Sequence, residues 1–280
     1  MKLLSYLGWG MIHERQEIPC QDVLGYAAHE NGNVVAVLAD GASGAKYGKE
    51  AAQANVDGIL DYFRDHSADR FRELEPETAA GAIVEACLER LRQQARELEG
   101  CRRGDLSATV MFALWDGHVL TLGHLGDGMI LVLDRSGGQS LFSRPEHLPE
   151  NRRGTWFTVS PGAAQHLRLY HLEEGQADGF LMTSDGAYGM LRSRGNAARA
   201  AGVLVEIVRE CRLNTCAELA ALLYRLEPQS GERLDDWSFW IGFPGEKSLP
   251  VELCPPISML REERERMSQA TEVSGFDHSS

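Results

Sequence analysis

The 280-residue sequence has little of several features that would assign it to a common class of proteins. No apolar run approaches the roughly 20 residues that a membrane-spanning helix needs. Trp9, Gly10 and His13 break the short apolar start, so we expect neither a signal peptide nor a membrane partner. The six cysteines form no CxxC pair, which argues against a structural zinc site and favours reduced thiols in a cytoplasmic protein.

Positive charge is also scarce. The formal net charge is −13, and basic residues cluster only at Arg102-Arg103 and around Arg152-Arg153. Because nucleic-acid binding needs a basic face, we expect no nucleic-acid partner. The surplus of carboxylates instead favours a divalent cation as a ligand.

No linker rich in Pro, Gly or Ser interrupts the middle of the chain, which favours a single domain over residues 1–245. Beyond it, Pro250, Pro255 and Pro256 break the periodicity of the sequence, and a charged run precedes a polar end. We therefore predict a C-terminal tail over residues 246–280, mobile or with a short helix near 257–267.

Apolar segments and helical patterns come in separate groups. The segments predict strands at 22–29, 34–39, 107–115, 119–124, 129–133, 179–183 and 237–243, the third to fifth of them as an antiparallel meander. Helical spacing is found over 50–63, 76–98, 198–211 and 216–226. Because the helices lie in pairs between runs of strands, we predict an α+β fold in which paired helices cover antiparallel sheets.

Acidic residues stand at the ends of many of these strands. They are Asp22, Asp40, Asp127, Asp185 and the pair Asp235-Asp236. A single Asp-Gly after a strand is more often a simple turn than a site. Five such positions, far apart in sequence, predict convergence at one edge of a sandwich. Gathered carboxylates repel one another unless cations neutralise them, and oxygen ligands suit Mg²⁺ or Mn²⁺.

In chain order, the segments CQDV, VLADGASGAKYGKEAA, SATVMFALWDGHVLTLGHLGDG, FLMTSDGAYGML and DDWSFWIG resemble the motifs of the metal-dependent serine/threonine protein phosphatases of type 2C, above all the bacterial branch. The resemblance spans residues 5–243. It implies a central sandwich of two antiparallel β-sheets, flanked on both sides by pairs of antiparallel helices. It also implies hydrolysis of phosphoserine or phosphothreonine by a water that bridges two Mn²⁺ or Mg²⁺ ions.

The resemblance assigns metal ligands to named positions. Asp40 matches the aspartate that contacts both metals, and Gly41 matches the residue whose backbone carbonyl binds one of them. Asp185 matches the aspartate of the family's SDG motif. The last ligand belongs to a D-[ND]-x-[ST] pattern, which makes Asp235 the ligand and leaves Asp236 as the neighbour with which it could be exchanged.

Other positions match the family less closely. Asp22 matches an acid that acts on the metals through water. Asp127 matches one ligand of a third ion, but Gly189 stands where a second is found, and a turn-holding role for Asp127 is equally open. The arginine that binds the substrate phosphate is absent at its usual spacing, and Arg15, two residues earlier, is the candidate for this catalytic role against a solvated surface role. Ala42 replaces a histidine that many members carry.

The retained acids favour an active enzyme whose partner is a phosphorylated protein, itself the product of a Ser/Thr kinase. The missing conventional arginine keeps a second hypothesis open: a pseudophosphatase that binds a partner without turnover. A phosphotransferase with Asp40 as nucleophile would need a DxD pattern, which Ala42 excludes. We expect the protein to be monomeric.

Overall fold

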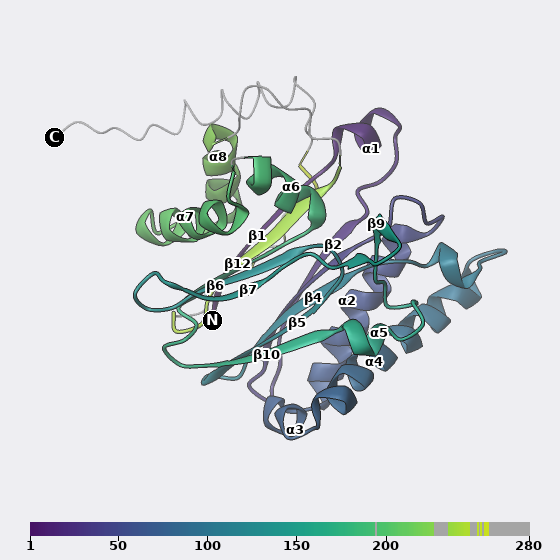
Figure 1. Cartoon of the computed structure of the whole chain (residues 1–280), viewed down its shortest axis with the longest axis horizontal. Helices are drawn as coiled ribbons and strands as arrows, with labels where there is room; N and C mark the ends of the chain where they lie inside the picture. Colours follow the sequence, from purple (N-terminus) through teal and green to yellow (C-terminus); the bar gives the residue numbers. More distant parts are fainter. Residues whose placement is uncertain (194, 227–234, 247–250, 252, 254, 258–280) are drawn as a thin grey trace.

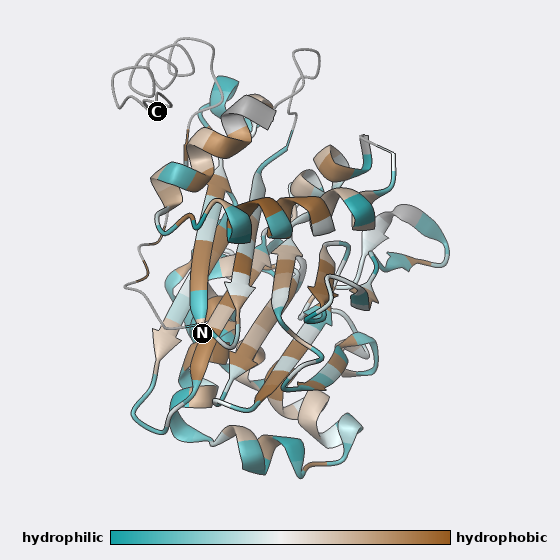
Figure 2. Ribbon diagram, turned by 90° about the vertical axis from the view of Figure 1, so that its left-hand side faces the viewer, coloured by the Kyte–Doolittle hydropathy of each residue, from teal (hydrophilic) through white to brown (hydrophobic). Residues whose placement is uncertain are grey.

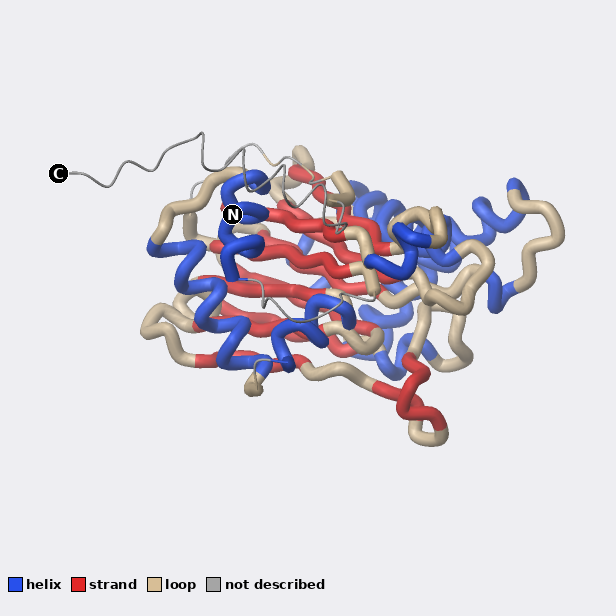
Figure 3. The backbone as a smooth tube through the Cα atoms, turned by 90° about the horizontal axis from the view of Figure 1, so that it is seen from above, coloured by secondary structure: helices blue, strands red, loops and turns tan. Residues whose placement is uncertain are grey.

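The computed structural model describes residues 1–193, 195–226, 235–246, 251, 253 and 255–257. Two five-stranded antiparallel sheets lie face to face, and helices cover the outer face of each (Figure 1). Seen from above, helices cross over the face of a sheet whose strands run side by side beneath them (Figure 3). The predicted α+β sandwich is therefore confirmed.

The first sheet has the strand order β10, β5, β4, β3, β2. These strands span Arg168–Glu173, Val119–Leu125, Val110–Trp115, Val34–Asp40 and Asp22–Ala28. Helix α2 (Gly48–Asp65) packs on β2 and β3, and α4 (Pro76–Glu97) packs on α2. The connections hold α3 (Ala68–Arg72), a 3-10 turn (Arg103–Asp105) and α5 (Ala163–His166).

The second sheet has the order β1, β12, β11, β6, β7. These strands span Lys2–Gly8, Trp237–Phe243, Gly179–Thr183, Met129–Leu133 and Gln139–Ser143. Its helices are α6 (Asp185–Ser193), α7 (Ala197–Glu210) and α8 (Cys216–Leu226), which contact β12, β6 and β1 respectively. Helix α1 (Met11–Arg15) follows β1, and a small hairpin consists of β8 (His147–Leu148) and β9 (Asn151–Thr155).

Strand β3 shows why the apolar runs lack alternation. Val35, Val37 and Ala39 pack under α2 and α4, whereas Ala36 and Leu38 face the second sheet. A strand covered on both faces needs apolar residues at every position, since burial of each large side chain stabilises the fold by about 1.5–3 kcal/mol. Figure 2 shows this concentration of apolar residues on the strands.

Most predicted elements are confirmed to within two residues at each end, but the strand predicted from Ser107 begins at Val110. The predicted meander is wrong in its third strand. Strands β4 and β5 pair, but β6 lies in the other sheet between β11 and β7. The short turn Gly126-Asp127-Gly128 suits either a hairpin or a crossover between the sheets, so the sequence does not distinguish the two connections. The crossover carries Asp127 into the space between the two sheets' edges.

Hydrogen bonds between buried groups cross the core between the sheets, and they join β12 to β3 and β5 to β7. The indole Nε1–H of Trp240 donates to the carbonyl oxygen of Val37 across the sandwich at 2.8 Å. Trp115, Trp237 and Trp240 are all buried, as predicted. None of the helices in the described ranges is both long and apolar enough to cross a membrane.

The sequence predicts a C-terminal tail after residue 245 and reduced cysteine thiols. Ile257 forms a parallel bridge with Gly8 at the edge of the second sheet. The helix predicted near 257–267 otherwise lies outside the described residues. The five cysteines that the structure describes form no disulfide, and Cys254 lies outside those residues.

Candidate active site

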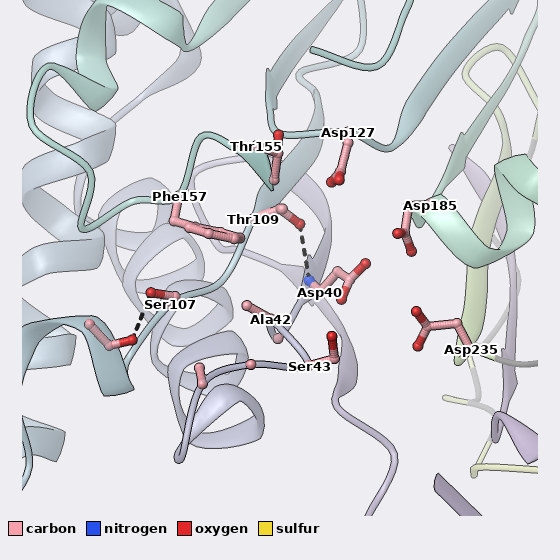
Figure 4. Close-up of a pocket in the computed structure, with 14 residues that line it drawn as sticks. Asp40, Ala42, Ser43, Ser107, Thr109, Asp127, Thr155, Phe157, Asp185 and Asp235 are labelled. Atoms are coloured by element: carbon pink, nitrogen blue, oxygen red, sulfur yellow. Dashed lines mark hydrogen bonds between the residues drawn. The ribbon is translucent and has the colours of Figure 1, made fainter. Parts of the chain in front are cut away.

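A cavity of about 370 Å³ opens at one edge of the sandwich. Four of the predicted aspartates line it: Asp40, Asp127, Asp185 and Asp235 (Figure 4). They come from the end of β3, the β5–β6 crossover, the start of α6 and the residues before β12. The convergence expected from the sequence is therefore observed for these four side chains.

Antiparallel pairing explains this convergence. In the first sheet, β2 begins where β3 ends, and the pairing register sets Asp22 opposite Asp40. In the second sheet, β11 ends beside the start of β12: the backbone N–H of Ser184 donates to the Ser238 carbonyl at 3.0 Å, and the Ser238 N–H donates to Ser184 Oγ. The end of one strand and the start of its partner therefore share an edge, which brings residues distant in sequence together.

Asp40 is held by the loop that precedes β4. Its backbone N–H donates to Thr109 Oγ1 at 3.3 Å, and the Thr109 N–H donates to the Asp40 carbonyl at 2.9 Å. The next residue must be glycine, because a Cβ atom on Gly41 would lie 2.4 Å from the carbonyl oxygen of Gly48 at the start of α2. Close packing of α2 against the strand end thus excludes any side chain at position 41.

The neighbours Asp235 and Asp236 have different surroundings. The Asp236 carboxylate is buried, and it accepts hydrogen bonds from the N–H of Gly10 (2.7 Å), the N–H of Gln21 (2.7 Å) and Nδ1 of His13 (2.9 Å). It therefore fastens both ends of the α1 loop to β12. Asp235 is exposed to the cavity. This arrangement agrees with Asp235 as the ligand and gives Asp236 a supporting position.

Asp22 is buried behind the cavity rather than in its lining. Neither of its carboxylate oxygens has a hydrogen bond of good geometry with a described group, although the hydroxyls of Ser238 and Ser184 lie close enough to favour the charged form. Burial and the charge of Asp236 raise its pKa well above the ordinary value. A buried carboxylate without strong donors is an unusual and destabilising feature.

The cavity concentrates negative charge. Burial, followed by the charges of Asp22 and Asp185, raises the pKa of Asp40. Burial and the Asp127 charge likewise raise the pKa of Asp185. Withdrawal from water raises the pKa of both Asp127 and Asp235 to about 6. Each carboxylate is thus harder to ionise than it would be in water, first because it is buried and then because the other carboxylates are near.

These residues fit a site for hard divalent cations. The donors around the cavity are carboxylate, hydroxyl and backbone oxygens, and no His or Cys of the described ranges lines it. Oxygen donors of this kind select Mg²⁺ or Mn²⁺ rather than zinc. Bound cations would also offset the repulsion that adds to burial in raising the four pKa values.

Other predicted positions have different outcomes. Arg15 is exposed at the end of α1 and is not among the residues that line the cavity. Among the side chains that the structure describes, which leave out those of Arg152 and Arg153, no Lys or Arg lines the cavity. The phosphate-binding role of Arg15 stays a prediction. Ala42 lines the cavity at the position where histidine is common in the family.

Sequence reasoning missed several polar and apolar residues of the cavity. They are Ser43, Ser107, Thr109, Thr155 and Phe157. The first three fall inside segments that carry the family resemblance, but no rule of spacing marks them out. Thr155 and Phe157 come from the end of the β8–β9 hairpin and the loop after it, which carry no recognisable motif. Only the tertiary structure brings them to the aspartates.

Comparisons with known proteins show which family model the chain matches and which solved structures share its fold. Residues 9–224 match the family model described as Protein phosphatase 2C. The fold resembles that of a bacterial serine phosphatase, with a TM-score of 0.63, 16% identity, and coverage of 88% of this chain and 99% of that one. It also resembles PppA, described as a key regulatory component of T6SS in Pseudomonas aeruginosa (TM-score 0.54, 20% identity, 86% and 96% coverage). A third structure is the serine/threonine phosphatase Stp1 from Staphylococcus aureus (TM-score 0.53, 13% identity, 87% and 94% coverage).

The structural identities are too low to show more than a shared fold, and no curated protein sequence matches the chain. The family model, in contrast, covers residues 9–224, which is most of the chain. The chain belongs to the protein phosphatase 2C family.

Proposed function

We propose that the protein is an active, metal-dependent phosphatase that removes phosphate from phosphoserine and phosphothreonine residues of proteins. The observation that carries this proposal is the gathering of four aspartates around one cavity, with Asp22 buried behind them. Such a cluster destabilises the fold through repulsion and desolvation. A module that only binds a partner would have no reason to keep it.

The proposed cation ligands are Asp40, Asp185 and Asp235, together with the backbone carbonyl of Gly41. Asp22 would act on the ions from behind through water. Asp127 lines the cavity where a third ion would be reached. When bound, two Mn²⁺ or Mg²⁺ ions supply a water of lowered pKa as nucleophile and positive charge for the phosphoryl oxygens.

The chain's own residues would orient and hold these groups. Thr109 fixes the backbone of Asp40 through two hydrogen bonds. Asp236 fixes the α1 loop beside Asp235 through Gly10, His13 and Gln21. Since Arg15 belongs to this loop, we propose that Arg15 binds the substrate phosphate. The hydrogen bonds to Asp236 would limit how far the loop can move.

The remaining expectations complete the proposal. The substrate is a phosphoprotein made by a Ser/Thr kinase, and the enzyme acts as a monomer in the cytoplasm. Residues 1–245 form the catalytic domain and 246–280 a tail that begins beside it. Ile257 supports this arrangement, because it pairs with Gly8 of the domain.

A pseudophosphatase is the second candidate function. The observation that favours it is that no Lys or Arg lines the cavity among the side chains that the structure describes, which leave out those of Arg152 and Arg153. Without a cation from the chain, substrate phosphate would depend on bound metals alone for charge compensation.

Hydrolysis of p-nitrophenyl phosphate and of a phosphothreonine peptide tests the proposal, with Mn²⁺, Mg²⁺ or EDTA. We expect turnover that requires metal and falls at least about 100-fold in Asp40→Asn, because charge stabilisation at the reacting group is lost. Asp65→Asn, an exposed acid of α2, is the matched control and should behave as the parent chain. A folded parent protein without turnover under any metal would favour the pseudophosphatase.

A further inference from the structure

One side of the cavity is not used by the proposed metal chemistry. The aspartates gather on one side, and Phe157 lies on the other, near Ala42 (Figure 4). Phe157 comes from the loop after β9, and its ring is partly exposed. An apolar ring in an otherwise polar and acidic cavity calls for an explanation.

Phe157 does not serve the hydrophobic core. Its neighbours Trp156 and Val159 pack against the core cluster under α2 and α4, and Trp156 also stacks on His166 with ring centroids 3.6 Å apart. Phe157 belongs to none of the three apolar clusters formed by the described residues. The loop therefore packs Trp156 and Val159 against the core and presents the Phe157 ring to the cavity, where apolar groups commonly contact a ligand.

The loop that carries Phe157 is fixed at both ends. Before the ring, Thr155 Oγ1 donates to the carbonyl oxygen of Glu146 at 2.6 Å. At the ring itself, the N–H of Phe157 donates to Ser160 Oγ at 3.0 Å, and the Ser160 N–H donates back to the Phe157 carbonyl at 2.9 Å. Immediately after it, the Thr158 N–H donates to the Ala108 carbonyl at 3.2 Å.

The same network also positions the aspartate side of the cavity. Asn55 of α2 is fully buried and accepts a hydrogen bond from Thr158 Oγ1 at 3.1 Å. Its Nδ2 lies 3.4 Å from the Ala108 carbonyl and 3.3 Å from the Thr109 carbonyl. Because Thr109 binds the backbone of Asp40, one buried network holds the ring and the predicted bridging ligand in a fixed relation.

We propose that Phe157 is a specificity-determining residue, which contacts an apolar side chain next to the phosphorylated residue of a protein substrate. This inference rests on the proposed function, since a phosphate held at the aspartates would bring the adjoining residue within reach of the opposite wall. An apolar neighbour would be buried against the ring. An acidic neighbour would find no hydrogen-bond donor on the ring and would lose part of its hydration there.

Phosphothreonine peptides that differ only in one flanking residue (Leu, Ala or Asp, on either side in turn) test this inference. With Mn²⁺, we expect the parent chain to prefer Leu to Ala by about tenfold in kcat/KM at one of the two flanks, as for a small apolar difference in a pocket. The preference should fall below about twofold in Phe157→Ala and be largely kept in Phe157→Leu. Phe142→Ala removes a half-buried ring from β7, in the second sheet, and is the matched control. It should leave the preference for Leu over Ala unchanged.

A binding measurement separates this inference from the proposed catalysis. Non-hydrolysable phosphonate versions of the same peptides are titrated with the Mn²⁺-loaded protein and followed by fluorescence anisotropy. Turnover with a Leu preference that survives in Phe157→Ala would overturn the inference and leave the phosphatase proposal standing. An absence of turnover, with a Leu preference in binding that Phe157→Ala removes, would overturn the catalysis and support the inference. Equal binding of all flanking residues by the parent chain would overturn the inference.

Discussion

The neighbouring residues Asp235 and Asp236 provide the sharpest test of the site. Asp236 is buried and accepts from two backbone N–H groups and His13, whereas Asp235 is exposed to the cavity. Substitution of each should therefore change a different property. We expect loss of Asp236 to lower the free energy of unfolding of the metal-free protein, and loss of Asp235 to lower only the affinity for metal.

The expected loss of unfolding free energy in Asp236→Ala follows from the hydrogen bonds that it breaks. Asp236→Ala leaves the buried N–H of Gly10 and the half-buried N–H of Gln21 without an acceptor. A fully buried donor of this kind costs about 1–3 kcal/mol, and a half-buried one costs less. Relief of the repulsion between Asp236 and Asp22 offsets part of this loss. We expect a net loss of about 3 kcal/mol, which lowers Tm by about 6–12 °C in a domain of this size.

Asp235→Asn should weaken Mn²⁺ binding without a loss of metal-free stability. The Asp235 carboxylate opens to the cavity, but burial and the Asp185 charge raise its pKa, so loss of the negative charge should leave the metal-free stability unchanged or raise it. Its affinity for Mn²⁺ should fall by more than the 10–100-fold that is typical when a residue only supports the ligands. In Asp236→Asn, the affinity for Mn²⁺ should fall by 10–100-fold, because this substitution would disturb only the loop beside the ligand.

Urea unfolding in EDTA and calorimetric titration with Mn²⁺ measure the two properties, with Asp65→Asn as the control for a lost surface charge. The reasoning would be refuted if Asp235→Asn lost as much stability as Asp236→Ala while Asp236→Ala kept its full Mn²⁺ affinity. That outcome would exchange the two roles and move the ligand one residue along the chain.

Two further predictions concern a glycine and a buried histidine. A Cβ atom at Gly186 would lie 2.1 Å from the Asp236 carbonyl oxygen. Gly186→Ala should therefore lower the free energy of unfolding in urea by more than about 2 kcal/mol and weaken Mn²⁺ binding. Gly189 faces open space on the same helix, so Gly189→Ala should be neutral or stabilising. Equal effects of the two would contradict the close packing of α6 on the residues before β12. Burial, and then the charge of Arg168, lowers the pKa of His124 well below its ordinary value. The unfolded chain therefore takes up a proton below about pH 6.5 that the folded chain does not, and stability falls as pH falls, by up to about 1.4 kcal/mol per pH unit from this group. Unfolding at pH 8 to 5 should show a shallower decline in His124→Asn, and parallel curves would contradict the assignment.

Local patterns in the sequence predicted the long elements well. The helical spacing in α2, α4 and α8 and the continuous apolar run in β3 each depend on how one segment is buried, which its own residues record. Strand β10, half-buried, and the short hairpin β8–β9 were not predicted, because mixed polar segments carry a weak periodic signal. The crossover at Gly126–Gly128 was misread as a hairpin, because the choice of partner strand is not encoded in the turn.

The sequence by itself determined the family, the order of the acids and their positions at strand ends, because these are properties of single segments. Only the tertiary structure decided what each acid contacts. The pairing register sets Asp22 opposite Asp40, and the packing of the α1 loop buries Asp236 among donors while Asp235 stays open to the cavity. Phe157 faces the aspartates for the same reason: hydrogen bonds between segments about 100 residues apart hold its loop there. A side chain's role depends on the groups that surround it, and those groups come from distant parts of the chain.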